Sequence, residues 1–265
     1  MSDLLAHAES LWQSVVVDLP AFTVEVLPSI DSTSSELMCR ARDGLVEPVL
    51  LTAEEQTAGR GRMGKGWHSK PGQSLTFSLA LPLAPADWSG LSLAVGVSLA
   101  ESLHPEVRLK WPNDLWLQER KLGGILVETA GSGAGASAPR TVVIGVGINI
   151  ARPEATAVQA LAAPGGVAAM PPAGLSELRM GVTAGEALAL VAPALVRDLL
   201  RFGAEGFAPF AARFARRDAL QGRVVRLSDG TEGTAEGVDA QGALRVATPQ
   251  GPRLVHSAEV SVRPC

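Results

Sequence analysis

Gln56-Thr57-Ala58-Gly59-Arg60-Gly61-Arg62-Met63-Gly64-Lys65-Gly66-Trp67 is the stretch around which the rest of this sequence is interpreted. Residues 59–67 hold four glycines and three fixed cations, a composition that favours neither a helix nor a strand, so we predict a loop. Glycine lets backbone N–H groups approach a ligand, and the Arg and Lys side chains suit a phosphate or a carboxylate. The stretch alone is equally compatible with a nucleotide site and with a surface loop of solvated arginines.

Two phosphate-binding patterns match this stretch in spacing. Gly59, Gly61 and Gly64 satisfy G-x-G-x-x-G, and the P-loop pattern fails only at Gly66, which lacks the hydroxyl that would hold magnesium. Both motifs must follow an apolar strand and open a helix. Here polar residues lead in, and a Pro-Gly pair at residues 71–72 leads out. The context therefore excludes both motifs.

Length and composition limit the class of protein. A chain of 265 residues with 46% apolar content can form one large domain and a small one. A net charge of −4 argues against a general nucleic-acid binder. Cys39 and Cys265 do not suggest a disulfide framework, and we see neither a signal peptide nor an apolar run of membrane-spanning length. We expect a cytoplasmic protein with no DNA or membrane partner.

Hydrophobic periodicity predicts both helices and strands. Helices are expected over residues 4–17, 37–42, 91–103, 183–201 (interrupted at Pro193) and 207–216. Strands are expected over residues 22–27, 49–51, 74–81, 107–111, 115–117, 121–128 and 140–150. The glycine-rich stretch then lies between two strands. Residues 129–139 and 151–173, rich in Gly, Ala and Pro, are expected to be flexible connections.

The sequence pattern changes at Gln221. Short strands are expected over residues 222–227, 242–246 and 253–256, separated by Asp-Gly and Gln-Gly turns. This spacing predicts a small β-barrel after a domain boundary near residue 218.

Five motifs occur in a consistent order along the chain. They are Asp31-Ser32-Thr33, the stretch quoted above, Lys110-Trp111-Pro112-Asn113-Asp114, Lys121-Leu122-Gly123-Gly124-Ile125-Leu126-Val127-Glu128, and Gly145-x-Gly147-Ile148-Asn149. Together they resemble the catalytic domain of biotin protein ligases. The resemblance implies an α+β fold with a mixed, mainly antiparallel sheet flanked by helices, similar to class II aminoacyl-tRNA synthetases, over residues 1–218. It also implies a C-terminal SH3-like β-barrel over residues 219–265.

The resemblance implies a two-step, ATP-dependent reaction. Biotin is activated to biotinyl-5′-AMP, and the biotinyl group then passes to a lysine of the biotin carboxyl carrier protein of a carboxylase such as acetyl-CoA carboxylase. The substrates would be biotin and ATP with Mg²⁺, whose number and ligands cannot be inferred from the sequence. An exposed sheet edge would allow a homodimer. No DNA-binding segment is recognised, so a ligase without a repressor role is expected.

Residue roles are carried over motif by motif. Lys121 would neutralise the biotin carboxylate and then the adenylate phosphate, Asp114 would orient the acceptor lysine, and Asn149 would bind the nucleotide. The implied catalytic residues are Lys121, Arg62 and Asp114. The implied biotin- and nucleotide-binding residues are Ser32, Thr33, Gln56, Gly59, Arg60, Gly61, Arg62, Lys65, Trp67, Lys121, Gly123 and Asn149.

Simpler structural roles compete with several of these assignments. Lys110 and Lys121 could be charges that protect a sheet edge, and Asp114 could form an Asx-turn. Ser32 and Thr33 could cap a helix, while Trp111 and Trp116 fit a core.

Two positions depart from the family pattern, and two other functions stay open. Ser34 stands where Asn often follows Ser-Thr, and Met63 occupies a slot that is often basic. A sensor that holds biotin or its adenylate without transferring it is one alternative. A lipoate-type ligase is the other, although the Gly-Arg-Gly-Arg sequence argues against it.

Overall fold

The computed structural model describes residues 2–45, 47–130, 139–153, 171–256 and 262–264. Within them, the larger unit is built on a seven-stranded sheet of order β1-β2-β5-β9-β8-β7-β6. The strands are β1 (Thr23–Ile30), β2 (Val49–Gln56), β5 (Ser74–Leu83), β6 (Arg108–Lys110), β7 (Asp114–Leu117), β8 (Arg120–Ala130) and β9 (Arg140–Asn149). Among these described strands, only β1 and β2 pair in parallel; the other neighbours pair antiparallel. The predicted mixed, mainly antiparallel α+β fold is confirmed.

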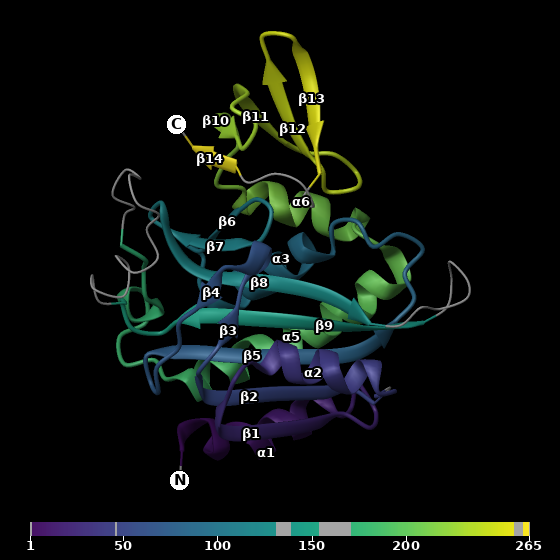
Figure 1. Cartoon of the computed structure of the whole chain (residues 1–265), viewed down its shortest axis with the longest axis vertical. Helices are drawn as coiled ribbons and strands as arrows, with labels where there is room; N and C mark the ends of the chain where they lie inside the picture. Colours follow the sequence, from purple (N-terminus) through teal and green to yellow (C-terminus); the bar gives the residue numbers. More distant parts are fainter. Residues whose placement is uncertain (1, 46, 131–138, 154–170, 257–261, 265) are drawn as a thin grey trace.

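Helices cover both faces of this sheet (Figure 1). One face packs against α1 (Asp3–Val15), α3 (Leu91–Leu103) and α5 (Ala184–Glu205), and the other against α2 (Thr33–Arg42). Side chains alternate accordingly along β2: Leu50 belongs to the large core, whereas Leu51 packs with Leu37 of α2. Because both faces are covered, the central strands β5 and β9 are buried along most of their length.

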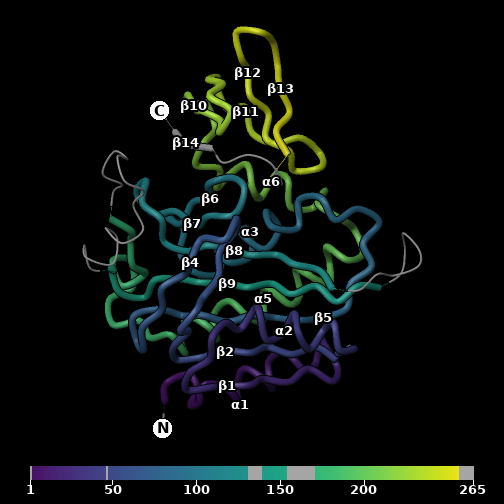
Figure 2. Tube along the Cα trace, viewed as in Figure 1, coloured from purple at the N-terminus to yellow at the C-terminus, as the bar shows by residue number. Residues whose placement is uncertain are grey.

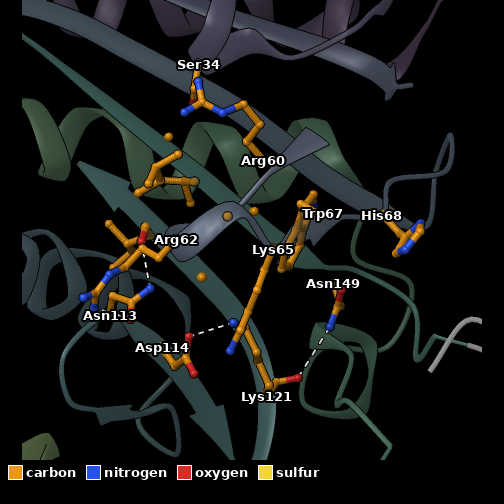
Figure 3. Close-up of a pocket in the computed structure, with 18 of the residues that line it drawn as sticks. Ser34, Arg60, Arg62, Lys65, Trp67, His68, Asn113, Asp114, Lys121 and Asn149 are labelled. Atoms are coloured by element: carbon orange, nitrogen blue, oxygen red, sulfur yellow. Dashed lines mark hydrogen bonds and ion pairs between the residues drawn. The ribbon is translucent and has the colours of Figure 1, made fainter. Parts of the chain in front are cut away.

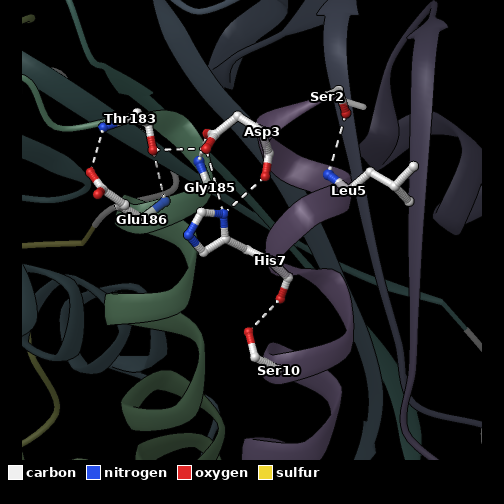
Figure 4. Close-up of polar contacts among 8 residues, drawn as sticks. All are labelled: Ser2, Asp3, Leu5, His7, Ser10, Thr183, Gly185 and Glu186. Carbon is white, nitrogen blue, oxygen red and sulfur yellow. Dashed lines mark hydrogen bonds and ion pairs between the residues drawn. The ribbon is translucent and has the colours of Figure 1, made fainter.

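Helices α1 and α5 are joined at their N-terminal ends by a side-chain cap (Figure 4). Asp3 of α1 accepts hydrogen bonds from the Thr183 hydroxyl at 3.1 Å and from the Gly185 amide at 2.6 Å, at the N-terminus of α5. A carboxylate there satisfies an amide that has no partner within its own helix. The cap fixes α1 to α5 on the face of the sheet opposite α2.

Two helix predictions need correction. The second helix begins at Thr33, not near residue 37, because the Ser32 side chain caps it by accepting a hydrogen bond from the Ser35 amide. Helix α5 continues through Pro193 without interruption. Its apolar face, including Leu188 and Leu195, is buried against the core, and this packing outweighs the cost of the proline. The last helix, α6 (Ala208–Arg217), agrees with prediction.

The predicted glycine-rich loop is instead a small hairpin. Strands β3 (Gly59–Arg60) and β4 (Gly66–Trp67) pair antiparallel, and η1 (Arg62–Gly64) forms the tip. A Cβ on Gly59 would lie only 2.5 Å from the Trp67 carbonyl oxygen, so glycine allows this close pairing. In the sequence the hairpin lies between β2 and β5, as expected. In space it crosses the face of the sheet that carries α2 (Figure 1).

The C-terminal unit is a separate five-stranded antiparallel sheet of order β13-β12-β11-β10-β14. Its strands are β10 (Val224–Leu227), β11 (Glu232–Val238), β12 (Leu244–Thr248), β13 (Gly251–Val255) and β14 (Val262–Pro264). Strand β11 was not predicted. The unit stands beyond α6 at the end of the molecule opposite the N-terminus (Figure 2). Val225 and Leu244 of this unit join the same core as the main sheet.

Parts of the two predicted connections lie outside the described residues. Strand β8 extends to Ala130, and residues 131–138 and 154–170 of the two expected connections lie outside the described residues. A short helical turn, η2 (Leu175–Glu177), follows the second connection. None of the helices described is both long and apolar enough to cross a membrane.

Candidate functional site

A cavity of about 590 Å³ lies between the β3–β4 hairpin and the sheet (Figure 3). Its walls come from the hairpin, the start of α2, the turn between β6 and β7, and strands β8 and β9. The predicted site residues that line it are Thr33, Gln56, Arg60, Gly61, Arg62, Lys65, Trp67, Asp114, Lys121 and Asn149. Ser32, Gly59 and Gly123 do not line it. Elements far apart in sequence thus bring most of the predicted residues together.

One end of the cavity holds a chain of hydroxyl and amide groups. Gln56 Oε1 accepts from both the amide and the hydroxyl of Thr33, at 2.7 and 3.0 Å. Thr33 Oγ1 lies 2.8 Å from the hydroxyl of Ser78, and Ser34 Oγ lies 3.0 Å from that same hydroxyl. Because the Thr33 hydroxyl donates to Gln56, Ser78 must donate to Thr33, and Ser34 to Ser78. The Gln56 amide nitrogen is thereby left as a donor, and Ser34 keeps acceptor capacity.

Ser78 was missed by the sequence reasoning. It is fully buried in the middle of β5, and its partners Thr33 and Ser34 are more than 40 positions away in sequence. A serine within an apolar strand was the only signal that could have identified it. Ser34, flagged as a departure from the family pattern, lines the cavity and makes this polar contact.

Two glycines of the Gly145-x-Gly147 motif make space for neighbouring side chains. A Cβ on Gly145 would collide with the Ser34 hydroxyl, and one on Gly147 would collide with the Trp67 ring. Both glycines therefore let polar or aromatic groups lie directly on the sheet. Nε1 of Trp67 is buried and has no hydrogen-bond partner among the described residues. A buried donor in a cavity wall is available to a ligand.

The other end of the cavity is charged. Lys121 Nζ lies 2.7 Å from Asp114 Oδ1, and Lys110 Nζ lies 4.0 Å from Asp114 Oδ2 and 5.2 Å from the centre of the Trp116 ring. Lys121 is on β8, between β7 and β9, so it does not protect a sheet edge, whereas Lys110 is on the edge strand β6. The Asp114 carboxylate faces these two ammonium groups, an arrangement that differs from an Asx-turn.

Arg62 reaches from the hairpin tip to the β6–β7 turn. It donates to Asn113 Oδ1 at 3.1 Å (Figure 3), and burial lowers the pKa of its guanidinium, partly offset by the Asp114 charge. Asn113 also donates from Nδ2 to the Ile125 carbonyl. Asn113 was not predicted as a site residue, because its role depends on the folded position of Arg62.

Three further residues flagged in the sequence have defined surroundings. Arg60 forms an ion pair with Glu128 at 3.0 Å, so it links the hairpin to β8. The Asn149 amide donates to the carbonyl of Ala173 at 3.0 Å, which places Asn149 at the cavity wall as a backbone anchor. Met63 is 72% exposed at the hairpin tip, in the left-handed region with φ 55°.

The two tryptophans expected in the core are buried, as predicted. Trp111 is 1% exposed and Trp116 is 9% exposed. Trp111 additionally lines the cavity, and the peptide bond that joins it to Pro112 is cis.

Metal binding by the protein itself finds no support in the part of the chain that is described. No group of three or more His, Cys, Asp or Glu side chains there could hold a metal ion. Among the described residues, the one carboxylate that lines the cavity, Asp114, is already paired with Lys121.

Comparison with known families divides the chain in the same way as the fold. Residues 26–149 match the Biotin/lipoate A/B protein ligase family, and residues 222–263 match the Biotin protein ligase C terminal domain. The first match contains all five motifs named above, and the second covers the smaller sheet except for the last residue of β14.

Comparison with individual proteins gives matches over most of the chain. It is 37% identical over 243 residues to the bifunctional ligase/repressor BirA of Escherichia coli (strain K12), covering 88% of this chain and 71% of that protein. It is 36% identical over 247 residues to the biotin--[acetyl-CoA-carboxylase] ligase of Paracoccus denitrificans, covering 89% and 98%. Among solved structures, it is similar to the biotin protein ligase of Aquifex aeolicus in complex with biotin and ATP, with a TM-score of 0.72, 26% identity, and 91% and 99% of the two chains covered.

Proposed function

This chain belongs to the biotin protein ligase family, and on that premise we propose that it joins biotin to a lysine of a biotin carboxyl carrier protein at the expense of ATP. The observation that carries the proposal is the composition of one cavity. A polar end of oriented hydroxyl and amide groups faces an end with Arg62, Lys121 and Asp114, with an aromatic wall between them.

In the proposed first step, the biotin carboxylate attacks the α-phosphorus of ATP. The bond between that phosphorus and the pyrophosphate oxygen breaks, and biotinyl-5′-AMP and pyrophosphate form. Two anions must approach each other, so fixed cations are needed to stabilise the charge that builds up. Lys121 and Arg62 both line the cavity and supply that charge.

In the proposed second step, the amine of the acceptor lysine attacks the acyl carbon of the adenylate. The bond from that carbon to the phosphate oxygen breaks, AMP leaves, and the attacking nitrogen gives up a proton to the Asp114 carboxylate or to water. Asp114 is suited to orient the incoming ammonium because it already binds Lys121 at 2.7 Å. The acceptor lysine would take the place of Lys121 beside Asp114.

The hairpin is proposed to protect the intermediate. A mixed anhydride hydrolyses readily, so water must be kept away until the amine arrives. Arg62 and Trp67 of the hairpin close one side of the cavity in the described structure, with Arg62 joined to Asn113. We propose that Lys65, also at the cavity wall, adds charge against the phosphates.

Magnesium is proposed to enter with ATP. The described residues offer no ligand cluster of their own. Mg²⁺ keeps several waters and binds readily to substrate phosphates, so the triphosphate is the expected source of its ligands.

Carrier biotinylation tests the proposal. The protein is incubated with ATP, Mg²⁺, biotin and a biotin carboxyl carrier domain, and the intact mass of the carrier is measured. We expect one biotinyl group on one lysine, and a carrier in which that lysine is replaced by arginine serves as the control. An unmodified carrier, with biotin-dependent pyrophosphate exchange intact, would favour a sensor of the adenylate. The same assay with lipoate in place of biotin tests the lipoate-type alternative, which a lipoyl group on the carrier would favour.

A further inference from the structure

The C-terminal sheet reaches the wall of the cavity through the turn between β11 and β12. The Trp111 indole donates from Nε1 to the carbonyl of Gly242 at 3.0 Å, and this hydrogen bond is buried. Trp111 lines the cavity in the larger unit, whereas Gly242 lies between β11 and β12 of the smaller one. A residue of the cavity wall is therefore held by the second unit.

The turn that presents this carbonyl is rigidly built. The Asp239 carboxylate accepts from the amides of Gln241 at 2.9 Å and Ala243 at 2.8 Å, and the Gly242 amide donates to the Asp239 carbonyl. Gly242 has a φ of +80°, a conformation that residues other than glycine rarely adopt. Asp239 thus fixes the direction in which the Gly242 carbonyl points.

The turn is also seated tightly against the larger unit. A Cβ on Gly242 would lie 2.9 Å from Gly90 Cα and 3.2 Å from Leu93 Cδ1, at the start of α3. Only a glycine can pack this closely there. The same region of α3 also holds Pro112, the residue that follows Trp111 in the cavity wall: the Ser92 hydroxyl donates to the Pro112 carbonyl at 3.1 Å.

Trp111 and Pro112 lead directly into the reactive part of the site. Asn113 accepts from Arg62, and Asp114 pairs with Lys121. The segment 111–114 is therefore held from α3, from β8 and from the C-terminal sheet, and it carries the contacts that set the positions of Arg62 and Lys121.

We propose that Asp239 is a positioning residue: through the Gly242 carbonyl and the Trp111 indole, it holds segment 111–114 so that Arg62 and Lys121 face the reacting groups. The inference rests on the proposed function. It assigns the C-terminal turn an effect on the rate of biotin activation, beyond its effect on stability.

Asp239→Ala tests the inference, with Asp229→Ala as a matched control. Asp229 caps a similar turn in the same sheet, accepting from the Thr231 amide at 3.0 Å, but a Cβ on the neighbouring Gly230 would meet no atom within 4 Å. Both variants remove a turn cap, and Asp229→Ala also removes an exposed ion pair with Arg253, so both should lower the melting temperature. Only Asp239→Ala should lower kcat of biotin-dependent pyrophosphate exchange, by roughly tenfold, with the KM for biotin changed less than about twofold.

A spectroscopic readout separates this inference from the proposed function. In ¹H–¹⁵N spectra of the full chain, the Trp111 indole resonance, assigned with Trp111→Phe, should shift in Asp239→Ala and stay in place in Asp229→Ala. Equal kcat values in the two Asp variants, or an unmoved Trp111 resonance, would overturn the positioning role. If the unaltered protein shows no exchange, the proposed function fails, and the resonance still decides whether Asp239 holds Trp111.

Discussion

At the end of the cavity that holds Thr33, Ser34 and Gln56, each polar side chain has its hydrogen-bonding direction set by a neighbour. The starting point is the Thr33 backbone amide, which can only donate and so fixes the accepting oxygen of Gln56. The Thr33 hydroxyl then donates to the same oxygen, so Ser78 donates to Thr33 and Ser34 donates to Ser78. The resulting combination of a donor at Gln56 and an acceptor at Ser34 suits a urea group, which offers both a carbonyl and N–H groups.

Ser78→Ala should weaken biotin binding because it breaks this chain at its centre. Leaving buried hydroxyls with one partner fewer costs about 1 kcal/mol, so the Kd for biotin measured by calorimetry should rise roughly fivefold. Ser98→Ala is the control. Ser98 is equally buried in α3, where its hydroxyl has no partner among the described residues, and biotin affinity should not change. Equal affinity of the Ser78 variant and the unaltered protein would contradict the role given to this chain.

Lys121→Ala should slow formation of the adenylate more than it weakens ATP binding. The ammonium stabilises charge that is greatest in the transition state, so kcat of pyrophosphate exchange should fall by roughly a hundredfold or more, whereas the KM for ATP should change by less than about tenfold. Lys70→Ala, at an exposed site outside the cavity lining, should behave as the unaltered protein. A proportionate change in both parameters of the Lys121 variant would indicate a binding role only.

At the scale of elements, the β3–β4 hairpin is tied to β8 and to the β6–β7 turn by two arginines. Arg60 holds one side of the hairpin to Glu128 on β8, and Arg62 holds its tip to Asn113. The hairpin could be placed from the sequence between two strands, but its pairing could not be predicted. Gly59 pairs with Trp67, and the Trp67 ring packs on Gly147. Because Gly147 lies 80 positions beyond Trp67, this packing cannot be read from the local sequence.

Arg62→Gly should release the activated intermediate faster. The variant loses the Asn113 contact and a cation beside the phosphate, so the dissociation rate of biotinyl-5′-AMP should increase by roughly tenfold or more. Stopped-flow measurement of intrinsic tryptophan fluorescence can follow that rate. Arg42→Gly provides a comparison in an arginine of α2 that does not line the cavity. An unchanged dissociation rate in the Arg62 variant would refute its proposed hold on the adenylate.

The junction between α6 and the C-terminal sheet carries a partly buried carboxyl group, that of Asp218. Burial raises the pKa of Asp218 above its ordinary value of 3.8, although the carboxylate accepts from the Leu220 amide; its Oδ2 has no partner among the described residues. A carboxyl whose pKa is raised by folding contributes stability at low pH and loses it as pH rises through the folded pKa. The charged form therefore destabilises the folded chain at neutral pH.

Asp218→Asn should raise the melting temperature at pH 7, and the difference from the unaltered protein should shrink towards pH 4. Asp229→Asn should behave in the opposite way. Hydrogen bonds from the Thr231 backbone and from Arg253 lower the pKa of Asp229 to about 2, so its stabilising charge is present above pH 3.8 and lost as pH falls towards 2. Melting curves at several pH values check both. Equal melting temperatures of Asp218→Asn and the unaltered protein at pH 7 would contradict this account.

For the whole molecule, one continuous core joins the two units. Leu220 and Val246 of the smaller unit belong to the same core as Leu79 of the main sheet, and Trp111 bonds directly to Gly242. The sequence predicted both units because each has its own periodicity, helical spacing in one and short strands with glycine turns in the other. It did not predict β11, where glycines and charged residues interrupt the apolar alternation, or the contact between the two units, which depends on tertiary packing.

The candidate site shows the same limit. Motifs marked residues such as Lys121 and Asp114 because a family pattern fixes their local spacing. Ser78 and Asn113 act through partners that are distant in sequence, so neither was assigned a site role, although Asn113 lies within one of the five motifs.

Biotin-dependent exchange of labelled pyrophosphate into ATP tests the central claim, that this cavity activates biotin, most directly. We expect exchange that requires both biotin and Mg²⁺, is not supported by lipoate, and falls sharply in Lys121→Ala while persisting in Lys70→Ala. Absence of biotin-dependent exchange in the folded, unaltered protein would contradict the account.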